Sequence, residues 1–405
     1  MIAPRTKFPL DYVNKTISVK FFGRESLFHL SHGLFSSNDI DAGTRLLLRC
    51  IGARLDLSHL GSILDVGCGA GVLGVTIGRA SPGAHIMLQD RDALAVAFAR
   101  ENCVANELQN ADLDCGLAFW HLQGESFDLI VSNLPAKAGR PVLQSFFSAA
   151  AGLLSRTGVG AVVIVSPLAQ FAREAVQSSG CLLFHAESTG QHTAFFFQKP
   201  ENAASDAPAF EDLGPYLRGR HAFDSGGVRY ELETAFNLPD FDTIGYSVEV
   251  AQEILPASRL QGDSLFWNPG QGHLPVCAQK KASRGFETLA IAGHDALELA
   301  ISERNLASAG RQVSRSLLLP TEAGLAEAVD PESIDLLCAV PHPVPKAPWH
   351  MDLALGAGKI LRKGGEMLAA GTSTDIFRVL DQCRGFKLVE SVKRLGHRAV
   401  LLRKN

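Results

Sequence analysis

The chain has 405 residues, with 38 Lys and Arg against 42 Asp and Glu and a net charge of −4 at pH 7. This length is large for one domain and suits two domains of about 200 residues each. Hydrophobic residues make up 46% of the sequence and charged residues 20%, a mixture that excludes a disordered chain or a fibre. The acidic balance excludes binding to nucleic acid through a global positive field, so an RNA surface must be a local patch.

The cellular compartment is predicted from three features. Residues 1–20 contain four basic residues but no uninterrupted apolar run, which does not fit a secretory signal. The most apolar run, residues 158–165, is too short to span a bilayer and predicts a buried strand. The eight cysteines form no Cys-x-x-Cys pair, which fits reduced thiols. We therefore expect a cytoplasmic protein without a membrane segment.

Short apolar runs alternate with amphipathic segments along the chain. In the first half, the clearest predicted strands are residues 62–66, 85–88, 127–132 and 161–165. This alternation predicts an α/β fold, in which a mostly parallel, doubly wound sheet carries helices on both faces.

Asp65 ends the first of these strands, which runs into a turn containing Gly67, Gly69 and Gly71. Glycines there allow positive φ and let the backbone approach a ligand without a Cβ in the way. The Asp65 carboxylate is placed to take an amino group of that ligand, directly or through water. Cys68 lies between two of the glycines, and we expect its backbone, not its thiol, to act.

Two further polar residues follow at the ends of later strands. Asp90 comes about 20 residues after the glycine turn, a position suited to ribose hydroxyls. The next segment ends in the loop Asn133-Leu-Pro135, at the edge of the sheet where α/β folds bind ligands. A glycine turn alone also fits dinucleotide-binding folds. A nicotinamide enzyme has no need of the Asn-x-Pro loop, which therefore favours another cofactor.

Pro200–Pro215 collects Pro, Asn, Ala, Ser and Asp without apolar periodicity, so it predicts a linker. The expected domains are residues 1–200 and 216–405. The second repeats features of the first in the same order, at separations of 203 to 207 residues. The matched pairs are Asp92–Asn102 with Asp295–Asn305, Gly67–Gly69 with Gly270–Gly272, Phe127–Ile130 with Ile334–Leu337, and Gly190–Thr193 with Leu395–Arg398. We infer a duplication.

The first half resembles the class I, Rossmann-like methyltransferases, in particular the "methyltransferase small" family that includes ribosomal RNA guanine-N2 methyltransferases. The resemblance covers roughly Leu27–Lys199 and rests on the glycine turn, Asp90 and the Asn133 loop. It also includes Gly33–Ser36 followed by Ile40–Thr44 ahead of the turn. The resemblance implies two tandem Rossmann-like domains and S-adenosylmethionine as the cofactor.

The family's site residues can be carried over to matching positions of this chain. The cofactor is then expected against the glycine turn (Gly67, Cys68, Gly69 and Gly71), Asp65, Asp90 and the Gly116–Leu117 turn, with Thr44 near its methionine end. In the family's Asn-Pro-Pro-aromatic loop, the Asn side chain and the following carbonyl accept hydrogen bonds from an exocyclic amine, and the aromatic residue stacks on a flipped base. The resemblance thus implies catalytic roles for Asn133 and Pro135.

This loop departs from the family pattern at Ala136, which replaces the aromatic residue. Phe35 or Phe22 is the expected substitute for stacking, and Lys137 is placed to bind a phosphate or carboxylate of the substrate. The first hypothesis is an N-methyltransferase acting on RNA through a local patch. The alternatives are a small-molecule or protein-amide methyltransferase and a non-catalytic module that binds the cofactor.

The second half is expected to keep the fold without the site. In Trp267–His273 two glycines remain, but on the 203-residue spacing Asn268 replaces Asp65 and Leu274 replaces Gly71, and the position of Asp90 falls near Gly293. The counterpart of the Asn-x-Pro loop, Val340–Lys346, has lost its Asn. We predict a degenerate methyltransferase-like domain for substrate recognition or structure. His342 and His350 lie in a proline-rich loop without Cys partners, so no metal site is expected.

Overall fold

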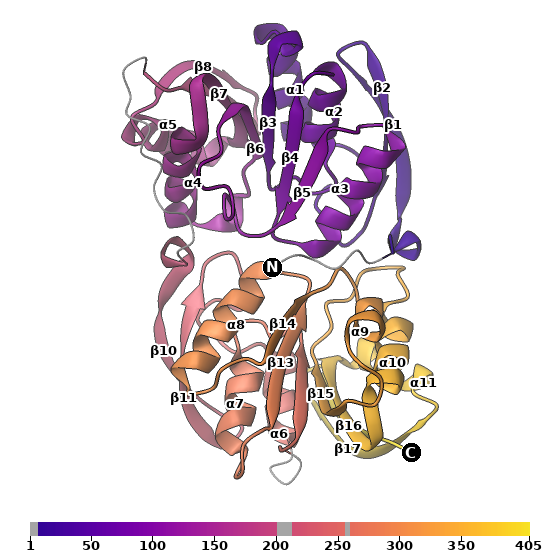
Figure 1. Ribbon diagram of the computed structural model, residues 1–405. Coiled ribbons are helices and arrows are strands. Elements are labelled where there is room, and N and C mark those ends of the chain that lie inside the picture. The colour runs from indigo at the N-terminus through magenta and orange to yellow at the C-terminus, as the bar shows by residue number, and fades with distance from the viewer. Residues whose placement is uncertain (1–6, 201–212, 256–259) are drawn as a thin grey trace. The chain divides into compact units, whose positions relative to one another are not determined.

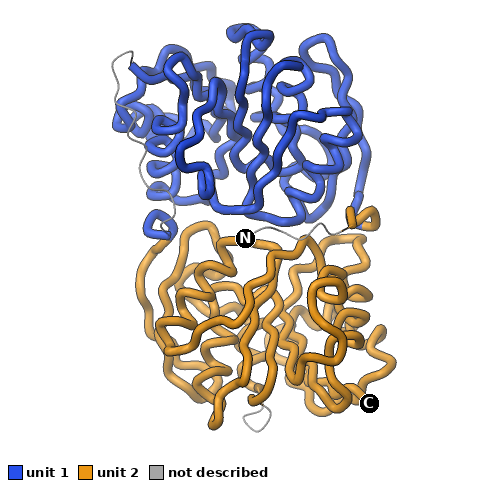
Figure 2. The backbone as a smooth tube through the Cα atoms, in the orientation of Figure 1, with its two compact units in different colours: residues 1–2, 12–216 blue, residues 3–11, 217–405 orange. Residues whose placement is uncertain are grey.

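The computed structural model of the chain describes residues 7–200, 213–255 and 260–405. They divide into two units, Tyr12–Tyr216 and Leu217–Asn405, and residues 7–11 group with the second (Figure 2). Most of the predicted linker, residues 201–212, lies outside the described residues.

The first unit is built on a seven-stranded sheet with the order β5-β4-β3-β6-β7-β9-β8 (Figure 1). The pairs from β5 to β7 are parallel, and β9 is antiparallel to both of its neighbours. A separate hairpin, β1–β2, precedes the sheet. The strands of the first unit are β1 (Lys15–Phe21), β2 (Arg24–Leu30), β3 (Ser62–Val66), β4 (His85–Asp90), β5 (Ala111–Cys115), β6 (Phe127–Asn133), β7 (Leu154–Val165), β8 (Leu182–Ser188) and β9 (His192–Gln198).

Five α-helices accompany this sheet: α1 (Ala42–Arg54), α2 (Val72–Ala80), α3 (Ala93–Ala105), α4 (Arg140–Leu153) and α5 (Ala169–Ser178). Helix α2 packs against both α1 and α3, whereas α4 packs against α5, so the helices form two groups. Parallel strands need crossovers that place helices over the sheet, which explains why most residues of β3 and β6 are buried. The core between β6, β7, α4 and α5 is rich in phenylalanine.

The second unit repeats this plan with the sheet order β14-β13-β12-β15-β16-β18-β17. Its strands are β10 (Leu217–Ser225), β11 (Val228–Ala235), β12 (Asp263–Trp267), β13 (Thr288–Gly293), β14 (Arg315–Leu318), β15 (Ile334–Ala339), β16 (Leu361–Thr372), β17 (Phe386–Arg394) and β18 (His397–Lys404). Its helices are α6 (Tyr246–Ile254), α7 (His273–Lys281), α8 (Ala296–Ser308), α9 (Ala323–Ala328), α10 (Trp349–Ile360) and α11 (Ser373–Gln382).

The predicted fold class and the duplication are confirmed, because the two sheets have the same strand order and each is preceded by a hairpin. The repeat extends to single side chains. Asp92 and Asp295 cap α3 and α8 by accepting the N–H groups of Leu94 and Leu297.

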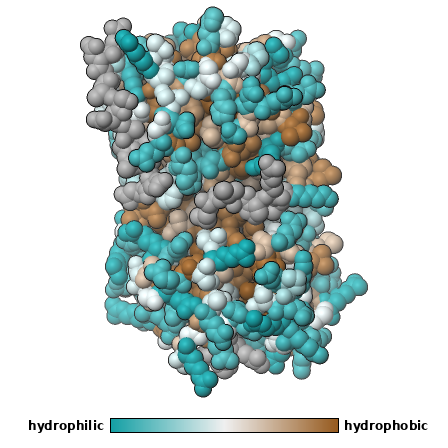
Figure 3. Space-filling model, viewed as in Figure 1, coloured by the Kyte–Doolittle hydropathy of each residue, from teal (hydrophilic) through white to brown (hydrophobic). Residues whose placement is uncertain are grey.

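The surface adds little to the question of partners. On the face shown in Figure 3, hydrophilic side chains cover most of each unit, with small apolar areas between them. Among the described residues, no helix combines the length and apolar character that a bilayer crossing requires.

Candidate cofactor and transfer site

The glycine turn lies at the carboxyl end of β3, between β4 and β6, where the strand order reverses. Ligands bind to open α/β sheets at such a switch point. Gly67, Gly69 and Gly71 have φ of 70°, 55° and 80°. A Cβ on Gly67 or Gly69 would meet no atom within 4 Å, whereas one on Gly71 would lie 3.2 Å from Ala99. The first two glycines therefore border open space, and the third allows close packing of α2 against α3.

Asp65 is fully buried under this turn. Its Oδ2 accepts the N–H of Gly74 at 2.8 Å, while its Oδ1 has no hydrogen-bond partner among the described residues. Burial chiefly, together with the negative charge of Asp90, raises the pKa of Asp65 to about 7, although the hydrogen bond from Gly74 lowers it. A buried carboxylate oxygen without a partner fits the ammonium group of an amino-acid ligand.

Asp90, at the end of β4, is bound to the turn through its carboxylate. Its Oδ2 accepts the N–H of Gly69 at 2.9 Å and its Oδ1 accepts the N–H of Asp92 at 3.0 Å. Each oxygen keeps acceptor capacity for a further donor. Burial chiefly, and the charge of Asp92, raise the pKa of Asp90 to about 6. The geometry suits a carboxylate that takes two hydroxyls of a ribose.

The Gly116–Leu117 turn lies beside Asp90, because the Gly116 N–H donates to the Asp90 carbonyl at 3.0 Å. Sequence reasoning missed Gln89, whose side chain holds the segment that follows. Its Oε1 accepts the N–H of Phe119 at 2.6 Å, and its Nε2 donates to the Trp120 carbonyl at 2.9 Å. The available signal was a polar residue that directly follows the apolar stretch Ile86–Leu88 and precedes Asp90.

Cys68 is buried, and burial raises the pKa of its thiol well above the usual range. Its backbone N–H donates to the Gln89 carbonyl at 3.0 Å. The thiol is therefore held protonated, and the residue contributes its backbone to the turn, as the sequence suggested.

Asn133, the last residue of β6, has its side chain fixed by two hydrogen bonds. Its Nδ2 donates to Asp41 Oδ1 and to Thr44 Oγ1, both at 3.1 Å. Because a carboxylate oxygen only accepts, the amide nitrogen must face Asp41. The Asn133 Oδ1 has no hydrogen bond from the described residues and is left as an oriented acceptor. The predicted Asn133 and Thr44 are thus brought together.

Asp41 is the second residue that sequence reasoning missed. Its Oδ1 also accepts the N–H groups of Gly43 at 2.8 Å and Thr44 at 3.0 Å, so it caps α1. The available signal was an Asp directly before the helix containing Thr44. One carboxylate oxygen therefore joins the start of α1 to the transfer loop.

The other predicted substrate residues surround this point less closely. Pro135, Ala136 and Lys137 are exposed at the short 3-10 turn η3 (Ala136–Ala138). Phe35 is 76% exposed, and its neighbour Ser36 donates to Asp41 Oδ2 at 3.4 Å. Phe22 lies elsewhere, against the C-terminal turn of α1, where a Cβ on Gly52 would come within 2.7 Å of its ring. Of the two aromatic candidates, only the chain at Phe35 lies next to the Asn133 cluster.

The second unit's glycine turn corrects the predicted pairing of the two loops. Gly272 begins α7 as Gly71 begins α2, and each donates its N–H to the carbonyl three residues before it. The two glycine turns are therefore 201 residues apart. The separation grows to 203 residues at the next strand, because the loop between α7 and β13 is two residues longer than the loop between α2 and β4.

With this spacing of the glycine turns, Gly69 and Gly71 correspond to Gly270 and Gly272, and Asn268 corresponds to Gly67. Asn268 has a φ of 49°, a left-handed conformation that Asn tolerates better than most residues. The predicted replacements of Asp65 by Asn268 and of Gly71 by Leu274 are therefore wrong. Phe266, which is buried, occupies the position of Asp65.

Two other positions of the second unit agree with the sequence pairing. Gly293, at the end of β13, corresponds to Asp90, and Val340, directly after β15, corresponds to Asn133. The second unit therefore lacks both carboxylates and the amide. His342 contacts His294, with 3.0 Å between Nδ1 and Nε2. The described residues contain no group of three or more His, Cys, Asp or Glu placed to hold a metal ion.

Comparison with known proteins identifies a similar family and a similar fold. Residues 25–178 match the model of the methyltransferase small domain. The "Ribosomal RNA small subunit methyltransferase C" of Actinobacillus succinogenes is 42% identical over 107 residues, which are 26% of this chain and 30% of that protein. The protein of the same name from Pseudomonas entomophila is 40% identical over 126 residues, 31% of this chain and 35% of its own length. The matches thus span about a third of these relatives.

The solved structure of the Thermus thermophilus 16S rRNA N2 G1207 methyltransferase, in complex with AdoMet and guanosine, superposes with a TM-score of 0.66. It covers 98% of this chain and 99% of its own at 15% identity, so the likeness concerns the fold. It extends over both units. The resemblance of the first half to the methyltransferase small family is confirmed.

Proposed function

We propose that this chain, whose residues 25–178 form a methyltransferase small domain, is an S-adenosylmethionine-dependent N-methyltransferase acting on an exocyclic amine of an RNA base. The observation that carries the proposal is the fixed amide of Asn133, which leaves Oδ1 to accept a hydrogen bond. An amine that donates to this oxygen has its lone pair turned out of that bond, toward a methyl donor. The names of the relatives support small-subunit ribosomal RNA as the acceptor. The name of the structural neighbour, a 16S rRNA N2 G1207 methyltransferase, supports guanine N2 as the methylated atom.

In this proposal the carboxylates of the first unit hold the cofactor. Asp65 pairs with its ammonium group through the unpartnered Oδ1, and Asp90 accepts its ribose hydroxyls. The backbone of Gly67 and Gly69 lies close to the ligand, where a Cβ would enter open space. The bound cofactor supplies a sulfonium methyl group that is already strongly electrophilic.

The remaining residues position the acceptor. Asn133 orients the amine, and Asp41 and Thr44 keep its amide from rotating. Lys137 is exposed next to this loop and is assigned to an anionic group of the substrate, and Phe35 to stacking on the base. Little acid–base chemistry is needed, so the placement of the amine supplies most of the rate.

One observation favours a second candidate, transfer to a small molecule or a protein amide. The exposed Ala136 presents no ring, and a lost stacking contact typically costs about 1–3 kcal/mol per base. A module that only binds the cofactor is less well supported, because such a module needs the carboxylates but not the oriented amide of Asn133.

The test is transfer of labelled methyl from S-adenosylmethionine to defined acceptors. Small-subunit ribosomal RNA transcribed in vitro carries no modification, so every site is open; it is compared with total transfer RNA, ribosomal protein and a small-molecule extract. Nucleoside analysis then identifies the methylated atom. Label in N2-methylguanosine with the wild type, and none with Asn133→Ala, is expected.

Label in protein or small molecules alone would replace RNA as the acceptor. No label in any fraction, together with tight binding of the cofactor, would support the binding module.

A further inference from the structure

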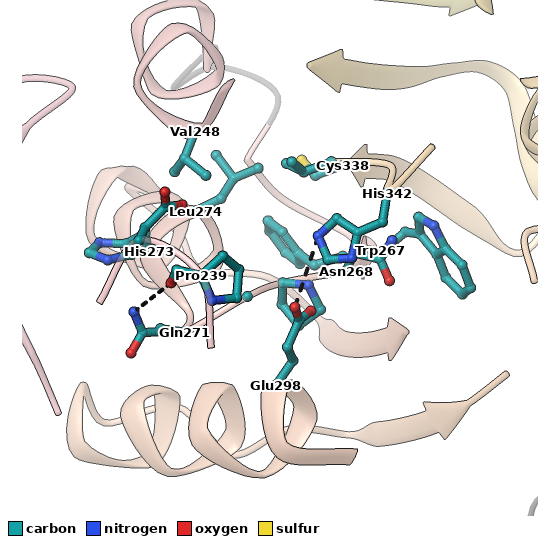
Figure 4. A pocket seen from close by; sticks show the side chains of 15 residues that line it. Pro239, Val248, Trp267, Asn268, Gln271, His273, Leu274, Glu298, Cys338 and His342 are labelled. Carbon is teal, nitrogen blue, oxygen red and sulfur yellow. Dashed lines mark hydrogen bonds and ion pairs between the residues drawn. The ribbon is translucent and has the colours of Figure 1, made fainter. Parts of the chain in front are cut away.

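The second unit contains a cavity of about 60 Å³ at the carboxyl ends of β12 and β15 (Figure 4). It lies where the first unit has its cofactor site, but the residues differ. A single water needs about 10–15 Å³ of such space, so the cavity has room for a molecule of a few non-hydrogen atoms. Apolar walls come from Phe266, Trp267, Val248, Leu274 and Cys338.

Two buried side chains that line this cavity lack hydrogen-bond partners. Asn268 is 2% exposed, and neither its Nδ2 nor its Oδ1 has a partner among the described residues. Glu298, in the first turn of α8, is also 2% exposed, and its Oε2 is likewise unpartnered. A buried polar atom without a partner costs free energy, more so when it is charged. Such atoms therefore mark a place where a ligand completes the hydrogen bonding.

The charge of the cavity indicates the class of ligand. Glu298 is a buried carboxylate, and its Oε1 lies 3.9 Å from Nε2 of the His342 imidazole, which carries a charge only when protonated (Figure 4). Asp240 adds a second carboxylate at the exposed side of the cavity. No Lys or Arg lines it. A ligand that balances this charge carries an ammonium group.

We propose that this cavity binds a small organic cation, a primary amine whose ammonium group pairs with Glu298 and whose polar end meets the amide of Asn268. S-adenosylmethionine does not fit the same residues. Phe266 stands at the position of Asp65, and Gly293 at that of Asp90. The degenerate copy has thus exchanged a large cofactor for a small ligand, independently of methyl transfer by the first unit.

Glycinamide is the probe, because it joins an ammonium group to an amide; acetamide lacks the charge and acetate reverses it. Binding to the full chain is measured by calorimetry. S-adenosylhomocysteine at saturation blocks the first unit, where Asp65 would also attract an amine. If S-adenosylhomocysteine does not bind, glycinamide binding is measured in the Asp65→Asn variant. Failure of the proposed function is then distinguished from failure of the cavity to bind an amine.

The wild type is expected to bind one glycinamide, and acetamide and acetate at least about tenfold more weakly. Glu298→Gln should weaken glycinamide about tenfold or more. Asn268→Gly, which suits the left-handed backbone, should also weaken it. Glu303→Gln, an exposed position on the same helix, is the matched control and should bind as the wild type does.

Two results would overturn the proposal: no saturable binding of glycinamide by the wild type at tens of millimolar, or equal binding by Glu298→Gln. If Glu298→Gln fails to fold, the preference of the wild type for glycinamide over acetamide decides the question without a variant. Equal affinity for those two probes then counts against the proposal.

Discussion

The two glycine turns have the same backbone and different chemistry. The third residue of each turn has a φ near 55° (Gly69, 55°; Gly270, 58°), and the fifth begins the helix in a left-handed conformation. Around the first turn, Asp65 and Asp90 supply carboxylates; around the second, Phe266 and Gly293 do not. The change of direction from strand to helix requires this backbone conformation. The conformation is therefore kept when the ligand-binding side chains are lost.

A buried asparagine that occurs in both units is the opposite case, because this polar side chain is kept in the second unit and serves folding. Asn102 Nδ2 donates to the Ala70 carbonyl, and Asn305 Nδ2 donates to the Gln271 carbonyl, both at 2.8 Å. Each also bonds the backbone of the hairpin ahead of its sheet. These residues fix α3 and α8 to the loops in both units, so similarity there is evidence of a shared fold and not of a shared site.

The largest expected effect separates Asn133 from its counterpart Val340. Asn133→Ala should lower kcat by about 100-fold or more while the cofactor Kd stays nearly unchanged, because a misplacement of about 1 Å costs that much. Val340→Ala should leave both values as they are. Single-turnover methyl transfer and calorimetry measure the two quantities.

A milder variant of the same cluster refines this test. Asp41→Ser keeps an N-cap side chain for α1 but loses the carboxylate that orients the Asn133 amide. A loss of kcat smaller than that of Asn133→Ala, with unchanged stability of the chain, is expected. Wild-type kcat in Asn133→Ala would mean that the transfer loop is misassigned.

The next effect concerns Asp90. Asp90→Ala should weaken S-adenosylmethionine about 10- to 100-fold, because charge-assisted hydrogen bonds to two hydroxyls are worth about 1.5–3 kcal/mol. The carboxylate also holds the N–H of Gly69, so Asp90→Asn, which keeps an acceptor, separates ribose binding from support of the turn. An unchanged Kd in both variants would place the ribose elsewhere. The stoichiometry should be one cofactor per chain.

Gly67→Asn gives the first turn the residue that the second turn has at the corresponding position, Asn268. Asn268 shows that this backbone accepts asparagine at positive φ, so the free energy of unfolding should change by less than about 1 kcal/mol. The added side chain enters the open space above the turn, and the cofactor affinity should fall about tenfold or more. Denaturant unfolding and calorimetry on the same protein provide the contrast. Undiminished affinity would mean that the cofactor lies away from Gly67.

Much of this comparison was accessible from the sequence, because α/β alternation and glycine spacing are local signals. The strand ends at Asp65, Asp90 and Asn133 followed from them, since carboxyl ends of parallel strands meet at one edge. The loop pairing failed for a local reason as well. Two glycines in Gly270–Gly272 match Gly67–Gly69 as letters, and only the capping geometry shows that they correspond to Gly69 and Gly71.

What the sequence could not reveal depends on contacts between distant segments. Asp41 lies 92 residues from Asn133, and nothing in either segment predicts the hydrogen bond between them. The cavity lined by Asn268 and Glu298 likewise joins a turn to a helix that begins after another strand. Burial without a partner is a property of the folded chain.

The pH dependence of cofactor binding tests the carboxylates that distinguish the first unit. Burial raises the pKa of Asp65 to about 7 and that of Asp90 to about 6, and only the ionised forms pair with an ammonium or accept two hydroxyls. If Asp65 alone governed binding, the affinity would fall about tenfold between pH 8 and pH 6. Calorimetry in buffers of different ionisation enthalpy should show proton release at pH 6, reduced in Asp65→Asn. Affinity independent of pH would contradict the assignment of the ammonium to Asp65.

The smallest effect is expected at Lys137, which is exposed beside the transfer loop and is not one of the residues that hold the cofactor. An exposed ion pair is worth about 0.2–1 kcal/mol, so Lys137→Ala should raise the KM for the acceptor by no more than about fivefold. The kcat should not change, because the lysine binds the acceptor without orienting its amine. Lys20→Ala, an exposed lysine on β1, is the matched control and should have the wild-type KM. The difference between the two variants should shrink at high salt, since screening weakens exposed charges. An increase in KM that persists at high salt would instead indicate that Lys137 is buried against the substrate, and equal KM values for both variants would remove it from the site.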